Sequence, residues 1–152
     1  MSMDRSDVVA VLNDLIETSR DGEQGFRTCA ENAKSSDLKS FFLDGAQRCQ
    51  KAVSELQQHV SQYGGSPDTT GTVAGAVHRG WVNLKSALSM NDDKAMLDEC
   101  ERGEDHAVSV YQGALQKDLP PDIKALVERM YQGTKQNHDK VRALRDQVRA
   151  AG

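Results

Sequence analysis

Aromatic residues and proline are scarce in this chain, and their scarcity argues against a β-sheet protein. Phe, Trp and Tyr make up 5% of the 152 residues, and only three prolines occur. Strands are enriched in aromatic and β-branched residues, so a core in this chain has to rest on Leu, Val, Ala and Met. The composition therefore predicts an all-α protein, long enough for one domain with a real core.

Basic clusters and long apolar runs are also missing. The net charge is −4, and no basic patch interleaved with aromatic residues occurs, which argues against nucleic acid as a partner. No apolar run approaches the roughly 20 residues of a membrane span. Residues 1–5 lack the apolar core of a signal peptide. We therefore expect a cytoplasmic protein without a membrane partner. The composition neither favours nor excludes a homodimer formed through helices.

The chain has three cysteines, Cys29, Cys49 and Cys100, and no Cys-x-x-Cys motif. Each falls on the apolar side of a predicted helix. Free cysteine is commonly buried, so we expect reduced, buried thiols.

Apolar residues recur at helical spacing in four long segments. The predicted long helices cover residues 7–34, 38–63, 94–117 and 123–149. Ser6 or Asp7 is the expected N-cap of the first helix, and residues 35–37 and 91–93 supply later caps.

The order of these segments predicts a ferritin-like four-helix bundle within a single domain, residues 1–152. One helical hairpin covers residues 7–63, a crossover covers 64–90, and a second hairpin covers 91–149. The crossover carries a short fifth helix, predicted over residues 73–90. Two hairpins joined by one long crossover make up the ferritin-like arrangement. Small and polar residues in the middle of the first helix leave room near the bundle axis.

Carboxylates interrupt apolar rows at the middle of two predicted helices. A helix through residues 97–115 places Glu101 and Glu104 in one otherwise apolar row, where acids are costly unless neutralised. Glu23 lies between apolar residues of the first helix, and counting from the turns brings His138 close to the level of Glu104. Carboxylate and imidazole ligands suit iron, manganese or zinc. Glu23, Glu101, Glu104 and His138 are therefore candidate metal ligands.

An alternative needs no metal. A di-iron bundle carries a Glu-x-x-His pair on each of two helices, and neither pair is present here. Arg48 on the second helix, and Thr134 and Lys135 on the fourth, stand at the corresponding level. Arg48, Arg102 or Lys135 could neutralise the same acids through ion pairs, and His138 would then be structural.

Two further groups carry polar chemistry. The segment His78-Arg79-Gly80-Trp81 places a glycine in a predicted helix, which costs about 1 kcal/mol relative to alanine and indicates close packing or a ligand. Trp81 is expected to anchor the crossover on the bundle. Glu55 and His59 lie four residues apart and are expected to form a solvated pair.

Motifs of other enzyme classes are weak or missing. The tight spacing of His78, Arg79 and Gly80 is not that of a histidine phosphotransfer bundle. No Gly-x-Ser-x-Gly elbow, P-loop or His-Glu-x-x-His occurs, so hydrolytic chemistry has no support.

The chain resembles an uncharacterised bacterial family of domains of unknown function that is grouped with the ferritin-like superfamily. The segments that carry the resemblance are Leu12–Glu17, Asp21-Gly22-Glu23, His78-Arg79-Gly80-Trp81, Glu101-Arg102-Gly103-Glu104-Asp105, His138-Asp139 and Leu144-Arg145. The resemblance implies a four-helix bundle and iron chemistry, but no established reaction. We expect a non-enzymatic bundle with a degenerate metal site and a binding or stress-related role. The alternative is a metalloprotein with redox or metal-storage activity.

Overall fold

Four long helices make up most of the computed structural model, which describes residues 3–66, 81, 84–90 and 92–151. The helices are α1 (Arg5–Asn32), α2 (Ser36–Gln62), α4 (Leu84–Ser89), α5 (Asp93–Leu115) and α6 (Pro121–Ala151). No strand occurs among the described residues. The predicted all-α class is confirmed.

Short polar side chains define the starts of the long helices. Asp4 caps α1 by accepting a hydrogen bond of 2.8 Å from the Asp7 backbone N–H. The expected cap at Ser6 or Asp7 is therefore wrong, because an aspartate a few residues earlier already accepts from the first turn. Ser35 caps α2 and Asp92 caps α5, both within the segments predicted to do so.

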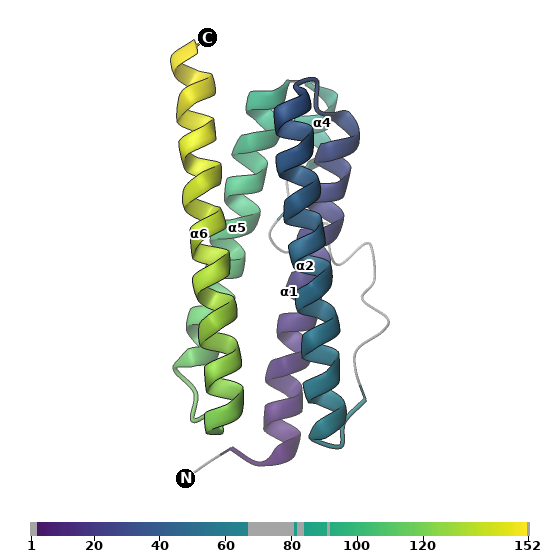
Figure 1. Ribbon diagram of the computed structural model, residues 1–152, viewed down its shortest axis with the longest axis vertical. Helices are drawn as coiled ribbons and strands as arrows, with labels where there is room; N and C mark the ends of the chain where they lie inside the picture. Colours follow the sequence, from purple (N-terminus) through teal and green to yellow (C-terminus); the bar gives the residue numbers. More distant parts are fainter. Residues whose placement is uncertain (1–2, 67–80, 82–83, 91, 152) are drawn as a thin grey trace.

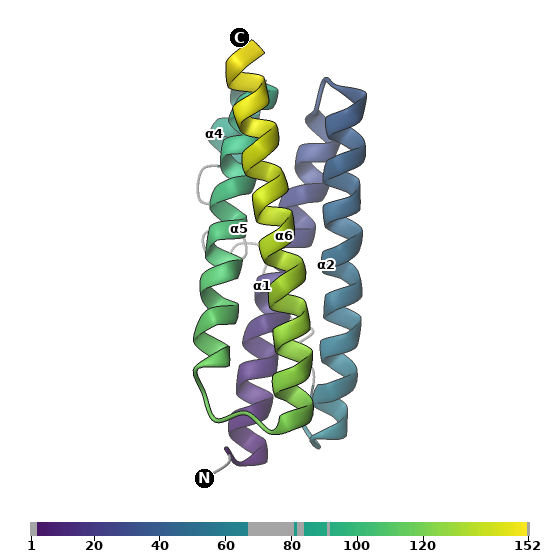
Figure 2. The same cartoon turned by 60° about the vertical axis from the view of Figure 1, so that its left-hand side comes forward.

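The long helices pair in sequence order. Figures 1 and 2 show α1 and α2 side by side and antiparallel, and α5 and α6 in the same relation. Helices α2 and α5 run in the same direction (Figure 1). The main contact between the two pairs is made by α1 and α5. In the described part of the chain, no helix is both long and apolar enough to cross a membrane.

Buried apolar side chains form two clusters, one toward each end of the long axis. Core 1 joins the first half of α1 to the second half of α2, the end of α5 and the first half of α6. Core 2 joins the other halves of these helices to Trp81 and α4. The fully buried members of core 1 include Val8, Leu12, Ile16, Leu56, Ile123 and Val127, and those of core 2 include Phe26, Phe42, Met96, Leu97 and Val141.

The crossover is described only in part. Helix α4 lies within the helix predicted over residues 73–90, whereas residues 67–80, with His78, Arg79 and Gly80, lie outside the described residues. Trp81 is 3% exposed and packs against Phe26 with a centroid distance of 5.2 Å. The expectation that Trp81 anchors this segment is confirmed.

All three cysteines are buried and free, as predicted. Cys29 of α1 and Cys100 of α5 lie with their sulfur atoms 3.8 Å apart. The contact joins the two helix pairs inside core 2.

Candidate functional site

A cavity of about 280 Å³ lies at mid-height in the molecule, between core 1 and core 2. All four long helices and Trp81 contribute to its lining. Helix α1 contributes the small residues Ser19 and Gly22, which agrees with the room predicted in the middle of this helix. Cavities of this size lie near the lower end of the range for small-molecule sites.

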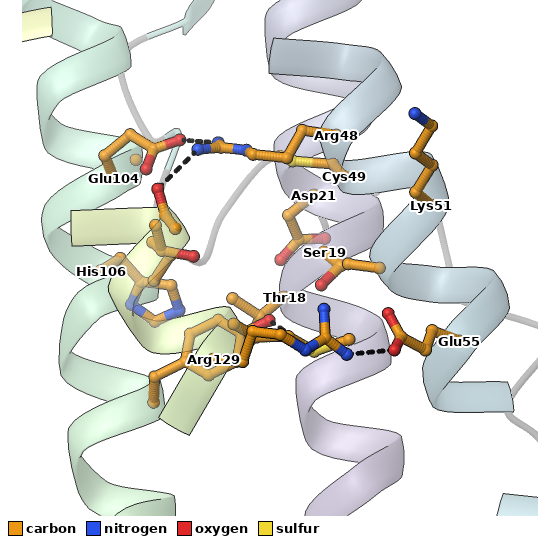
Figure 3. Close-up of a pocket in the computed structure, with 18 of the residues that line it drawn as sticks. Thr18, Ser19, Asp21, Arg48, Cys49, Lys51, Glu55, Glu104, His106 and Arg129 are labelled. Atoms are coloured by element: carbon orange, nitrogen blue, oxygen red, sulfur yellow. Dashed lines mark hydrogen bonds and ion pairs between the residues drawn. The ribbon is translucent and has the colours of Figure 1, made fainter. Parts of the chain in front are cut away.

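An ion pair crosses the cavity from α2 to α5. Figure 3 shows Arg48 and Glu104 pointing toward each other, with Arg48 Nη2 2.8 Å from Glu104 Oε1. Arg48 Nη1 also donates to the backbone carbonyl of Gly133 on α6, at 3.3 Å. The guanidinium lies 5.9 Å from the centre of the Phe26 ring. One cationic group therefore links α2 to both helices of the second pair.

The second carboxylate oxygen of Glu104 has no such partner. Glu104 is 3% exposed, and its Oε2 is enclosed without a hydrogen-bond partner among the described residues. Burial raises the pKa of Glu104, and the Arg48 guanidinium acts in the opposite direction without cancelling the effect of burial. One oxygen of the Glu104 carboxylate is therefore paired with Arg48, and the other is enclosed by protein atoms next to Asn137 of α6.

Two other polar side chains in the cavity are neutral at physiological pH. Burial raises the pKa of the Cys49 thiol to about 12 and that of the Tyr111 phenol to about 12. The Tyr111 hydroxyl donates weakly to Met130 Sδ at 3.9 Å. Nucleophilic cysteines have a lowered pKa, so Cys49 has the opposite of a catalytic thiol's properties.

The rim of the cavity is charged. Glu55 of α2 forms an ion pair with Arg129 of α6, and Lys51 and His106 also line the opening (Figure 3). The Arg129 side chain is 62% exposed, so this pair is solvated and weak. Glu55 was expected to face His59, but His59 Nδ1 instead contacts the Glu55 backbone carbonyl at 2.9 Å.

Trp81 forms an apolar wall of the cavity because two glycines make space for its ring. A Cβ atom on Gly25 of α1 would lie 2.5 Å from the indole, and one on Gly103 of α5 would lie 2.3 Å from it. Carbon atoms in contact are normally about 3.5–4.0 Å apart. Only glycine permits the ring to lie this close to both helices.

A second polar cluster lies between α5 and α6. One ligand atom from each of Glu101, Asp105 and His138 lies within 4.8 Å of the other two. His138 Nε2 is 2.5 Å from Asp105 Oδ1, and the Glu101 carboxylate is paired with Arg145 of α6. Within the described part of the chain, this is the one group of three such residues close enough to share an ion.

The four predicted metal ligands are distributed over three sites. Glu101 and His138 share the second cluster, whereas Glu104 lies in the cavity and is paired with Arg48. Glu23 lies 3.5 Å from Arg27 on the same helix, with 27% of its side chain exposed. Of the predicted neutralising residues, Arg48 has the expected role and Arg102 contacts Glu99 instead, at 3.7 Å.

Sequence reasoning missed Asp105 and Arg145. Asp105 follows Glu101 by one helical turn, and Arg145 follows His138 by two turns. Helical spacing alone could therefore have placed Asp105 on the same helix face as Glu101, and Arg145 on the same face as His138. The sequence contained part of the information needed to predict the cavity, because Gly22, Gly103 and Gly133 are small residues that line it from three different helices.

Comparison with known proteins gives a family and no activity. None of the curated proteins compared with the chain matches it significantly. Residues 7–117 match the family described as "Domain of unknown function (DUF2383)", over helices α1, α2, α4 and α5. Since the match covers well over half of the sequence, the chain belongs to this family of domains of unknown function.

Proposed function

We propose that this protein is a four-helix bundle of ferritin-like topology that binds a small organic molecule in its interhelical cavity and has no di-metal centre. The parallel direction of α2 and α5, between two antiparallel pairs, supports this topology (Figure 1). The single observation that carries the proposal is the Arg48–Glu104 ion pair, which crosses the cavity.

The residues around the cavity do not fit a di-metal centre. Such a centre needs carboxylate and imidazole ligands from all four helices. Here Arg48 brings a positive charge to the carboxylate of Glu104, and Thr134 lines the cavity on α6 where a ligand would be needed. A guanidinium repels a metal cation at close range. The cavity lining is therefore unsuited to holding a pair of metal ions.

The cavity is suited to binding rather than covalent catalysis. Its lining combines apolar side chains such as Ala52, Ala107 and Met130 with a few buried polar groups, which is the usual composition of a ligand site. An engineered apolar cavity of about 150 Å³ holds benzene, so a cavity nearly twice as large holds on the order of a dozen non-hydrogen atoms. The neutral Cys49 thiol offers no activated nucleophile.

A cavity-filling variant tests the proposal. Ala107→Leu adds three carbon atoms at the cavity wall, and Ser109→Leu adds a similar side chain at an exposed position of the same helix. We expect small aromatic probes to bind the unsubstituted protein with Kd on the order of 0.1–1 mM for about eight non-hydrogen atoms. Isothermal titration should show this binding unchanged in Ser109→Leu and lost in Ala107→Leu. Equal binding by both variants would refute the proposal.

A second candidate function is supported by the cluster of Glu101, Asp105 and His138. We propose that, if this chain binds iron, manganese or zinc, it binds one ion there. The close spacing of three suitable ligand atoms supports this site, whereas the pairing of Glu101 with Arg145 opposes it.

Elemental analysis tests the second candidate. After growth with added iron, manganese and zinc, a true site should retain about one ion per chain and lose it in His138→Ala but not in His59→Ala. Arg145→Gln should raise the metal content, because it releases the Glu101 carboxylate. Metal below about a tenth per chain in all variants would leave the cluster as an ion-pair network.

A further inference from the structure

We propose that Cys29 of α1 and Cys100 of α5 form a reversible disulfide bond, with a low-molecular-weight disulfide as the oxidant. Both thiols are free in the structure described above. The bond joins the hairpin of α1 and α2 to the hairpin of α5 and α6. The inference is independent of the proposed ligand, because neither cysteine lines the cavity.

The two sulfur atoms already touch. Cys100 Sγ donates a weak hydrogen bond to Cys29 Sγ over a distance of 3.8 Å. Carbon atoms in contact lie about 3.5–4.0 Å apart and sulfur is larger, so no other atom separates the two thiols. A disulfide bond is about 2.05 Å long. The sulfur atoms therefore need to approach by about 1.8 Å, through rotation of the two side chains and a small shift of α1 toward α5.

The position of the pair makes the bond a link between the two hairpins. Helices α1 and α5 form the main contact between the helix pairs, and Cys29 and Cys100 meet there from positions 71 residues apart in the sequence. One turn away on the same two helices, Trp81 lies between Gly25 and Gly103. A disulfide at this contact closes a loop of roughly 70 residues, and the restriction of the unfolded chain increases with loop length.

The surroundings of the pair favour this bond over the two other pairings that three cysteines allow. Cys29 and Cys100 are both 0% exposed and belong to core 2. The sulfur of Cys49 instead lies against α1 at Gly22, where an added Cβ atom would be 2.8 Å from it. The Cys49 thiol is also hydrogen-bonded with Arg48. Packing therefore directs Cys49 toward the cavity and the other two cysteines toward each other.

The exchange is balanced in atoms and electrons. One cysteine thiolate attacks a sulfur of the small disulfide, breaks its S–S bond and releases one small thiolate, which leaves a mixed disulfide. The second cysteine thiolate attacks the protein sulfur of this mixed disulfide and releases the second small thiolate. The two cysteines lose two electrons, which the small disulfide gains. The two thiol protons pass through water to the released sulfurs, so the products are one protein disulfide and two small thiols.

Burial makes this exchange slow in the folded protein. Desolvation raises the pKa of the Cys100 thiol, and the hydrogen bond with Cys29 raises it further, so little thiolate is present at neutral pH. The thiols react while core 2 is open, either before the chain has folded or during local unfolding. Once core 2 has closed over the bond, reducing thiols are excluded in the same way.

Refolding with glutathione tests the pairing at equilibrium. The reduced protein is unfolded in urea, diluted into buffer with an excess of oxidised over reduced glutathione, and alkylated at its remaining thiols. Trypsin places the three cysteines in separate peptides, residues 28–34, 49–51 and 95–102, so mass spectrometry identifies the joined pair. Random pairing gives the three disulfides in about equal amounts. We expect peptides 28–34 and 95–102 to be joined at least about tenfold more often than either other pair.

Thermal unfolding tests whether the bond links the hairpins. In Cys49→Ala, which leaves one possible intramolecular disulfide, the oxidised protein should have a Tm about 5–10 °C above that of the reduced protein. The matched control, Cys29→Ala combined with Cys49→Ala, forms no intramolecular disulfide and should have one Tm under both conditions. If circular dichroism shows that Cys49→Ala does not fold, the oxidised and reduced forms of the unsubstituted protein supply the comparison.

The results divide into those that support the bond and those that overturn it. Joined peptides 28–34 and 95–102 together with the rise in Tm would support the proposal. Chains that stay fully reduced in excess oxidised glutathione, or equal amounts of the three disulfides, would overturn it. A preferred bond between Cys29 and Cys100 without a higher Tm would overturn its role as a link between the hairpins.

Discussion

Replacing Gly103 by alanine should destabilise this protein, although alanine is the better helix former. Gly103 lies in α5 and faces the indole of Trp81. The added Cβ would lie 2.3 Å from Trp81 Cε2 and 2.7 Å from its Nε1. The ring is rigid and is itself packed against Gly25 on the other side, so it cannot move away without leaving its site.

The expected magnitude is the difference between two opposing effects. Alanine in place of glycine stabilises a helix by about 1 kcal/mol. Overpacking a closely packed site costs about 1–3 kcal/mol, and loss of the Trp81 packing moves the cost toward the upper limit. The net effect at Gly103 is a destabilisation of about 1–2 kcal/mol.

Gly113 provides a matched control in the same helix. It is exposed, and a Cβ atom there would have no neighbour within 4 Å. Gly113→Ala should therefore stabilise the protein by about 1 kcal/mol. The two variants should differ by about 2–3 kcal/mol, or roughly 5–10 °C in Tm for a chain of this size.

Thermal and urea unfolding followed by circular dichroism measure the difference. In a Trp81→Ala background, Gly103→Ala should become stabilising, as at Gly113, because the clash has been removed. If Gly103→Ala stabilises the unsubstituted protein as much as Gly113→Ala does, the packing of Trp81 between α1 and α5 is not as described.

Three other predictions concern the buried polar groups. Arg48→Met leaves Glu104 buried without its partner and should lower the free energy of unfolding, measured in urea, by about 3 kcal/mol. Arg129→Met removes the solvated pair with Glu55 and should lower it by at most about 1 kcal/mol. Equal losses in the two variants would contradict the burial of the Arg48–Glu104 pair. Burial raises the pKa of Glu104 above its unfolded value of about 4.3, so the contribution of this group to stability is complete below about pH 4.3 and is lost as the pH rises through the folded pKa. The free energy of unfolding, relative to that of Glu104→Gln, should therefore fall from about pH 4 toward neutrality. A rise over this range would show that the pKa of Glu104 is lowered. With its pKa raised to about 12, Cys49 has on the order of a thousandfold less thiolate at pH 8 than an unfolded cysteine. Alkylation followed by mass spectrometry should therefore find Cys49 unmodified until urea unfolds the chain. Rapid labelling of Cys49 in the native protein would refute its burial.

The helices were predictable because their signals are local. Apolar spacing and the caps at Ser35 and Asp92 act within one or two turns, and the long helices lie within a few residues of their predicted limits. The first cap was misplaced because Asp4, Ser6 and Asp7 are all good caps, and sequence alone does not rank them.

The candidate site was less predictable because its contacts depend on how the helices are rotated about their axes. The sequence indicated that Glu101 and Glu104 needed neutralising partners, and it included Arg48 among them. It did not indicate Arg145 for Glu101, since residues 44 positions apart meet only through the packing of α5 on α6. Nor could the sequence predict that one carboxylate oxygen of Glu104 lacks a hydrogen-bond partner among the described residues, because that depends on how the four helices pack together.

Because the apolar interior is divided into core 1 and core 2, the two halves of each long helix are stabilised by different sets of buried side chains. Every long helix contributes one half to each core, with the cavity and the Arg48–Glu104 pair between the halves. One end can therefore open while the packing at the other end persists, and the backbone remains continuous between them. Amide hydrogen exchange should resolve two cooperative units within single helices, and a molecule bound in the cavity would join them into one.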